Sequence, residues 1–243
     1  MTTRVSNAPR PAATVVVVRP SATAPFDVLL VRRNDRVAFM AGAYVFPGGR
    51  VDDSDRTVRP AARFLTDPPR FPDLSPSEEM PYRVAASREL EEEAGVRVEV
   101  DDLVPLAHWV TPEVEPRRYD TRFYLTLMPE GQVALHDEGE TVDLIWASAA
   151  AATARCLRGE IQLPPPTWTT LRQLERHLTL AGLLAWAAGK PIARVEPVLR
   201  TGPDQTVLTL PGDPSYPTIE GWDVPEETRF VLREGRGWLP TRL

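Results

Sequence analysis

Arg88-Glu89-Leu90-Glu91-Glu92-Glu93-Ala94-Gly95-Val96 is the stretch that decides the fold of this chain. If the stretch is helical, Glu89, Glu92 and Glu93 are three or four positions apart, so their carboxylates gather on one face. Gly95 stands where helices commonly end in the left-handed conformation. The stretch therefore predicts the last turns of a helix that presents three carboxylates together.

Placing these glutamates together has a cost. Like charges at this spacing repel by a few tenths of a kcal/mol per pair, roughly, and the helix dipole disfavours negative charge near its C-terminus. A bound cation would compensate both penalties, and converging carboxylate oxygens suit Mg²⁺ or Mn²⁺. The alternative is that the glutamates form a solvated helix face, as most glutamate-rich helical runs do.

Arg88–Val96 follows the pattern Arg-Glu-apolar-x-Glu-Glu-x-Gly-apolar, which resembles the second half of the Nudix box. Upstream, Phe46-Pro47-Gly48-Gly49 resembles the start of that box. A Pro- and Asp-rich insertion at about residues 51–77 separates the two halves. The chain is thus identified as resembling Nudix hydrolases, with a long insertion inside the box.

The central glutamate of the box is out of register in this chain. Counted back from Arg88, it would fall at Met80, whereas the nearest acids are Glu78 and Glu79. We therefore assign no catalytic role to Glu78 or Glu79 from the sequence.

Composition limits the class of protein. The formal net charge of −6 argues against a nucleic-acid polymer as partner, which would require a basic surface. The single cysteine, Cys156, has no partner for an internal disulfide, which suits a reducing compartment. The apolar run Val15–Val18 is far too short to span a membrane. We expect a cytoplasmic protein without a membrane partner.

The apolar patterns predict an α/β fold. Strands are expected in the segments that are β-branched or alternate in hydrophobicity, which are 12–19, 27–33, 43–46, 98–100, 104–110, 119–127 and 143–147. A long helix should start at a capping box beginning with Ser75, or at Pro81, and run to Ala94. A second helix should follow Ser148 as N-cap. This order agrees with the Nudix-type α/β/α sandwich around a mixed sheet that the resemblance implies.

Three regions are expected along the chain. Residues 1–11 form a flexible N-terminal tail, 12–160 a Nudix hydrolase domain, and 161–243 a C-terminal extension packed on the same domain. In the extension, the leucines of 167–188 recur at helical spacing and predict one long amphipathic helix, followed by short strands such as 205–210 and 229–233. This helix suits a homodimer as well as a monomer core.

The resemblance implies a metal-dependent hydrolase. Glu89, Glu92 and Glu93 are the expected metal ligands, and either Glu89 or Glu92 is the general base. Arg88 is expected to orient the glutamates. The Gly48 carbonyl and an acid of the loop before Trp146, with Glu140 preferred, complete the expected set of ligands for Mg²⁺ or Mn²⁺. A divalent ion of this kind offsets phosphate charge and activates bound water.

Substrate residues are predicted from two sources. Arg32, Arg33 and Arg117 are suited to bidentate contacts with phosphates. The aromatic rings of Phe46 and Tyr119 could stack on a base, and Gly49 allows close approach of the backbone. The alternative for the aromatic residues is a place in the core.

The expected substrate is a small nucleoside diphosphate derivative. Leu29-Leu30-x-x-Arg33, followed by Gly42 and Phe46-Pro47-Gly48-Gly49, is similar to the pattern of coenzyme A diphosphatases, and the long insertion resembles their peroxisomal-type branch. Coenzyme A or acyl-coenzyme A is therefore preferred. ADP-ribose, nucleotide sugars, dinucleoside polyphosphates and oxidised dNTPs remain alternatives, as does a regulatory module that binds a nucleotide without hydrolysing it.

Overall fold

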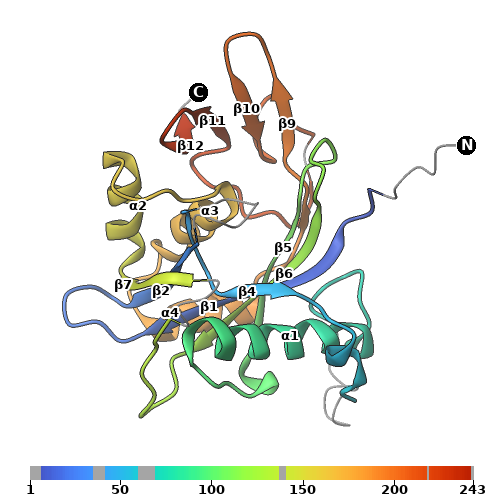
Figure 1. Ribbon diagram of the computed structural model, residues 1–243, viewed down its shortest axis with the longest axis vertical. Coiled ribbons are helices and arrows are strands. Elements are labelled where there is room, and N and C mark those ends of the chain that lie inside the picture. Colours follow the sequence, from blue (N-terminus) through green and yellow to red (C-terminus); the bar gives the residue numbers. More distant parts are fainter. Residues whose placement is uncertain (1–6, 35–41, 60–68, 137–140, 218, 242–243) are drawn as a thin grey trace, which may run out of the picture.

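The computed structural model describes residues 7–34, 42–59, 69–136, 141–217 and 219–241 (Figure 1). Two sheets are present in this part of the chain. The first sheet follows the order β3-β2-β1-β6-β5-β8, with β4 added to β1 and β7 added to β2, and the second follows β12-β11-β10-β9. Figure 1 shows α1 below the first sheet and α2 and α3 above it, which is the α/β/α arrangement expected from the sequence.

The first sheet is mixed. Its strands are β1 (Arg10–Arg19), β2 (Asp27–Arg33), β3 (Tyr44–Val45), β4 (Gly48–Arg50), β5 (Val104–Val110), β6 (Tyr119–Leu127), β7 (Thr141–Ala147) and β8 (Arg194–Val195). Within it, β1 pairs in parallel with β6 and β5 pairs in parallel with β8, whereas β1 with β2 and β5 with β6 are antiparallel. β1 begins at Arg10, within the range 1–11 that was expected to be a tail.

The central strand β1 is buried on both faces. Val15 and Val17 pack with the apolar side of the helix α1, whereas Val16 and Val18 belong to the core cluster on the opposite face. Successive strand residues point to opposite faces, so a run of valines is the pattern expected of a strand covered on both sides. The β-branched run of the sequence thus indicates a strand that is covered on both faces of the sheet.

The helix α1 (Pro76–Ala94) carries the glutamates. The sequence left two starting points open, and the structure selects the capping box: the Ser75 hydroxyl accepts a hydrogen bond from the Glu78 N–H, and the Glu78 side chain accepts one from the Ser75 N–H. Pro81 lies inside the helix. At the other end, Gly95 adopts φ 65° and its N–H donates to the Glu91 carbonyl at 2.9 Å.

The strand expected at 98–100 is wrong. This segment has no strand and leads into a 3-10 turn, Val100–Asp102. Its carbonyl groups are satisfied by α1 side chains instead: the Ser87 hydroxyl donates to the Val98 carbonyl at 2.7 Å, and Arg83 donates to the Val100 carbonyl at 2.9 Å. The valines of this segment predicted a strand. In the structure its carbonyl groups accept hydrogen bonds from α1 side chains, so no neighbouring strand is needed.

The single helix expected at 167–188 is also wrong. The structure has two helices, α3 (Pro165–Leu174) and α4 (Leu180–Gly189), which follow α2 (Ala149–Arg158). Thr179 starts α4 as its N-cap, accepting the Gly182 N–H at 3.0 Å. Leu178, which continued the apolar pattern in the sequence, is 80% exposed. Side-chain capping therefore overrides the periodicity at this point.

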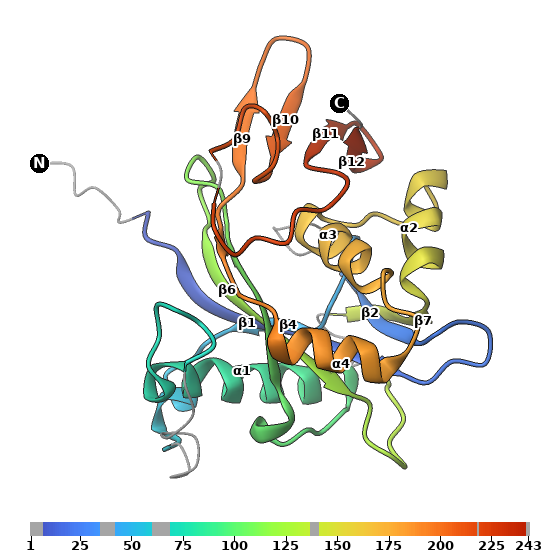
Figure 2. The ribbon, with the colours of Figure 1, turned by 180° about the vertical axis from the view of Figure 1, so that it is seen from behind.

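The C-terminal extension joins the core of the first sheet. Its β8 pairs with β5, and its remaining strands β9 (Val198–Thr201), β10 (Thr206–Thr209), β11 (Arg229–Arg233) and β12 (Gly237–Thr241) form the antiparallel second sheet. Figures 1 and 2 show β9 and β10 standing at the end of the molecule away from α1. Leu171, Leu208 and Phe230 of the extension are buried in the same cluster as Val16 of β1.

The insertion is anchored at its C-terminal end. Phe71 is fully buried, and Asp73 accepts two hydrogen bonds from Arg122 of β6, at 2.8 and 2.7 Å. Arg70 donates to the Ala187 carbonyl of α4 at 2.9 Å and to the Lys190 carbonyl at 3.0 Å. These bonds place a guanidinium at the C-terminus of α4, where the helix dipole favours positive charge. The described part of the insertion thus connects the central sheet to the extension.

No helix in the described ranges is both long and apolar enough to span a bilayer.

Lys190, the only lysine of the sequence, predicts a pH effect on stability. Its Nζ donates to the Leu106 carbonyl of β5 at 2.8 Å, and burial lowers the pKa of its ammonium from 10.5 to about 8. Between these values the unfolded chain holds the proton and the folded chain does not. The free energy of unfolding should therefore rise between about pH 8 and 10.5, by up to about 3 kcal/mol from this group.

The measurement is urea unfolding of the parent and of Lys190→Met at pH 7 and pH 10. The difference in unfolding free energy between the two proteins should shift in favour of the parent as the pH rises. An unchanged difference would show that burial does not perturb this ammonium.

Candidate active site

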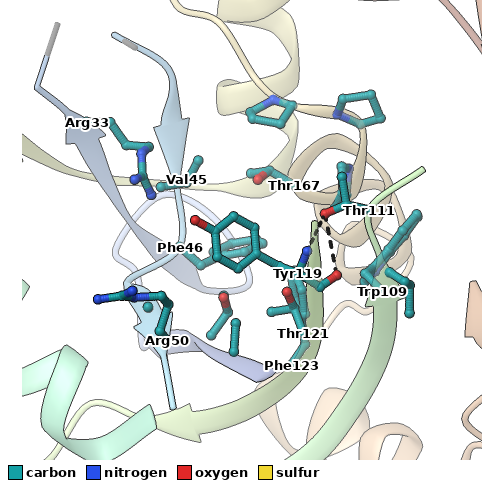
Figure 3. Close-up of a pocket in the computed structure, with 18 of the residues that line it drawn as sticks. Arg33, Val45, Phe46, Arg50, Trp109, Thr111, Tyr119, Thr121, Phe123 and Thr167 are labelled. Carbon is teal, nitrogen blue, oxygen red and sulfur yellow. Dashed lines mark hydrogen bonds between the residues drawn. The ribbon is translucent and has the colours of Figure 1, made fainter. Parts of the chain in front are cut away.

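The three predicted glutamates line one cavity of about 820 Å³. The cavity lies between the last turns of α1, the strand β4 and the ends of β5 and β6, and the extension closes its far side. Figure 3 shows Arg33 and Arg50 on one side of the cavity and Trp109 and Thr111 on the other, with Phe46 and Tyr119 between them. Charged and apolar groups therefore face the same space.

Arg88 connects the two halves of the motif. Its Nε and Nη2 donate to the two carboxylate oxygens of Asp55, each at 3.0 Å, and its Nη2 also donates to the Arg50 carbonyl at 2.9 Å. Its Nη1 donates to Glu89 at 2.9 Å and to Glu92 at 3.0 Å. The hydrogen bonds with Asp55, followed by the charge of Glu89, raise the pKa of Arg88 above its ordinary value. Arg88 is therefore held as a cation that fixes both glutamates.

Asp55 is the acid that sequence reasoning missed. Its side chain is 2% exposed, and it lies in the 3-10 turn Ser54–Thr57 (η1) directly after β4. Counting back from Arg88 stays on the C-terminal side of the insertion and reaches Met80. Counting forward from Gly49 instead reaches Asp55, among the first residues of the insertion. Glu79, in contrast, forms a buried ion pair with Arg83 at 2.6 Å, and Glu78 serves in the capping box.

Glu93 and Glu89 are each fitted to one glycine of the Gly48-Gly49 turn. The Gly48 N–H donates to Glu93 Oε2 at 2.9 Å, and Glu93 is buried at 5% exposure. A Cβ built on Gly49 would lie 2.3 Å from the carboxyl carbon of Glu89, which real Cβ atoms do not approach. The glycine turn therefore packs directly on the carboxylates.

Gly49→Ala is expected to lower activity about a hundredfold, because the added methyl displaces the Glu89 carboxylate by about 1 Å or more. The group that must move is the far end of a flexible side chain, so the fold should remain. Activity and thermal unfolding of the variant provide the measurement. Gly189→Ala is the control, since a Cβ at Gly189 meets no atom within 4 Å. Parent-level activity in Gly49→Ala would contradict the close packing.

The structure brings most of the other predicted residues to this cavity. Arg33, Phe46, Gly48, Gly49 and Tyr119 all line it, and among the described residues no group forms a hydrogen bond with the buried Nε of Arg33. Such a buried, unpaired donor at a cavity wall is suited to an anionic ligand.

Two predicted arginines lie elsewhere, and one acid cannot be placed. Arg32 is not among the cavity-lining residues: it pairs with Tyr44 across β2 and β3, and successive strand residues face opposite sides of a sheet. Arg117 is exposed in the turn before β6 and does not line the cavity. Glu140 lies outside the described residues.

The donor chemistry of the cavity fits a divalent cation. Three carboxylates from one helix face line it, and oxygen ligands are those that Mg²⁺ and Mn²⁺ prefer. Among the residues that the structure describes, however, no group of three or more acidic, histidine or cysteine side chains is gathered around one point. Arg88 holds Glu89 and Glu92, and the Gly48 N–H holds Glu93.

Comparison with known proteins agrees with this geometry. Residues 76–175 match the family profile of the NUDIX domain. This chain contains a NUDIX domain. The human protein named acyl-coenzyme A diphosphatase NUDT19 is 27% identical over 314 aligned residues, which cover 93% of this chain and 83% of that protein. A Gallus gallus protein of the same name is 27% identical, with coverage of 79% and 73%.

A solved structure supports the fold independently. The crystal structure of a NUDIX hydrolase from Alicyclobacillus acidocaldarius is 26% identical and superposes with a TM-score of 0.60, covering 76% of this chain and 98% of that chain. The relation of this protein to Nudix hydrolases thus extends from the box residues to the α/β/α architecture.

The C-terminal extension, whose role the sequence left open between core, pocket and dimer interface, contributes to the wall of the cavity. Eight lining residues come from it, namely Pro164, Pro165, Pro166, Thr167, Pro197, Leu199, Leu208 and Trp238. None of these side chains carries a charge, and the sequence offered no chemical motif there. The three consecutive prolines supply the N-cap and first turn of α3 beside the cavity.

Proposed function

We propose that this Nudix hydrolase cleaves the phosphoanhydride bond of coenzyme A or acyl-coenzyme A, with Mg²⁺ or Mn²⁺ as cofactor. The observation that carries the proposal is that one large cavity joins a cluster of carboxylates to an apolar half. A diphosphate with a nucleotide on one side and a long organic group on the other requires both environments. The names of the NUDT19 relatives favour this substrate over other nucleoside diphosphates.

The residues of the cavity have separate roles in the proposed hydrolysis. Glu89, Glu92 and Glu93, with the Gly48 carbonyl, would hold the divalent ion, which when bound offsets phosphate charge and lowers the pKa of water. Either Glu89 or Glu92 takes a proton from the attacking water, which adds across the phosphorus–oxygen bond of the anhydride. Arg88 keeps both carboxylates in place. Arg33 and Arg50 face the cavity and supply positive charge for the phosphates that are not cleaved.

The hypothesis of a regulatory module that binds without hydrolysis depended on the missing central acid of the box. Asp55 pairs with Arg88 at the place where such an acid is needed, so this hypothesis loses its support. A cytoplasmic location remains our proposal, supported by a cysteine without a disulfide partner. A homodimer also remains a prediction, to be tested by light scattering.

The test is a product screen by mass spectrometry. Purified protein with millimolar Mg²⁺ or Mn²⁺ is incubated with coenzyme A, acyl-coenzyme A, ADP-ribose, a nucleotide sugar, a dinucleoside polyphosphate and an oxidised dNTP. We expect 3′,5′-ADP and phosphopantetheine, or its acyl derivative, as the dominant products. Preferential cleavage of another diphosphate would overturn the substrate, and binding without any cleavage would overturn the hydrolase.

A further inference from the structure

One face of the second sheet is turned toward the cavity. Leu199 of β9 and Leu208 of β10 are cross-strand partners, and Leu208 lies opposite Phe230 of β11. Phe230 lies opposite Pro240 of β12, and Trp238, two residues before Pro240, shares the same face. Leu199, Leu208 and Trp238 all line the cavity. We call these three residues, together with Pro197, the apolar wall.

The apolar wall differs chemically from the other end of the cavity. The α1 end presents Glu89, Glu92 and Glu93 together with Arg88. The wall presents leucine, proline and tryptophan side chains without charge, and Leu199 and Trp238 remain partly exposed beside the buried core. Partly exposed apolar side chains that face a cavity gain free energy when an apolar ligand covers them.

We propose that the apolar wall is the subsite for the hydrocarbon chain of an acyl-coenzyme A, and that the C-terminal extension therefore sets the preference for acylated substrates. This inference rests on the proposed function. A base, a ribose and a phosphate each carry groups that need hydrogen bonds, and Leu199, Leu208 and Pro197 cannot supply them. A hydrocarbon chain needs none, and each methylene removed from water strengthens binding by a factor of about four.

The geometry of the substrate agrees with this assignment. With the diphosphate beside the glutamates, the two groups attached to it must extend away from α1. Arg33, with its unpaired buried Nε, lies on one side of the cavity and suits the phosphorylated nucleotide. Trp109, which Figure 3 places on the opposite side, belongs to the same core cluster as Leu208 of the wall, and both line the cavity. The acyl group then occupies the uncharged end.

The test compares kcat/KM for free coenzyme A and for acyl-coenzymes A of increasing chain length. In the parent, the ratio of acylated to free substrate should rise with chain length. In Leu199→Asn, the polar amide enters the wall and this ratio should fall about tenfold. In Leu199→Trp, the larger side chain shortens the space beside the apolar wall, so the preferred acyl chain should become shorter. Thermal unfolding confirms that each variant is folded.

Val207→Ala is the matched control, because Val207 is the neighbour of Leu208 on the opposite face of β10 and does not line the cavity. Its ratio should equal that of the parent. Equal losses on free and acylated coenzyme A in both Leu199 variants would mean that the wall contacts a shared part of the substrate, which overturns the inference. A parent that cleaves another diphosphate but neither coenzyme A form overturns the proposed function itself, so the two failures are distinguishable.

Discussion

Glu93→Gln is expected to lower kcat/KM by a factor of about 10² or more while leaving the fold intact. Glu93 is buried, lines the cavity and is held by the Gly48 N–H. Glutamine keeps the shape and an oxygen that can accept this hydrogen bond, so stability should change little. It removes the negative charge that the proposed cation would bind, and groups acting directly on the reaction contribute about 10²–10⁴-fold.

Glu91→Gln is the matched control for this change. Glu91 lies two residues before Glu93 and does not line the cavity; it forms an ion pair with the exposed Arg97 at 2.7 Å. Its replacement should leave activity unchanged. A second readout is metal affinity, measured by calorimetry with Mn²⁺, which should weaken in Glu93→Gln and not in Glu91→Gln. If Glu93→Gln turned over every substrate at the parent rate, the carboxylate site would be refuted.

Arg88→Ala is expected to have the largest effect on stability, lowering the free energy of unfolding by about 3–5 kcal/mol. The side chain of Asp55 is 2% exposed, and Arg88 donates two hydrogen bonds to it. Removing the guanidinium leaves a buried carboxylate without its cation. Activity should fall as well, because Glu89 and Glu92 lose the donor that holds them. Urea unfolding and kcat/KM provide the two measurements.

Arg97→Ala supplies the comparison for Arg88. The side chain of Arg97 is 79% exposed and its ion pair with Glu91 is solvated, so its loss should change stability by less than about 1 kcal/mol. The double variant Arg88→Ala with Asp55→Ala should lose less unfolding free energy than the sum of the losses of the two single variants, since it also removes the unpaired carboxylate. Additive losses would mean that Asp55 does not depend on Arg88.

The sequence predicted the elements whose local signals and tertiary packing agree. The β-branched run of β1 and the alternation of β6 each specify one structure, and that structure is observed. The capping box of α1 was one of two possible helix starts, and it is the one observed. The glutamate spacing on α1 likewise predicted that three carboxylates would share one helix face, and all three line the cavity. In these cases periodicity and burial favour the same arrangement.

Prediction failed where side-chain hydrogen bonds or distant segments decide the structure. Apolar spacing continued through Leu178, yet Thr179 caps a new helix there. Asp55 lies near the start of the insertion, 33 residues before Arg88 in the sequence, so its hydrogen bonds with Arg88 depend on the tertiary fold and not on a local pattern. The apolar wall consists of ordinary leucine, proline and tryptophan residues, whose role follows only from the register of the second sheet.

The strand order of the first sheet also governs how the protein is made. β1 leaves the ribosome first, but its parallel partner β6 is synthesised only after α1 and the insertion. β8, the neighbour of β5, follows later still. Such long-range pairing is slow, and apolar strands are prone to aggregate until their partner strands have been synthesised. A nascent chain released before Val195 would leave the edge of β5 opposite β6 without its partner, so the first sheet is completed only after α4 has been synthesised.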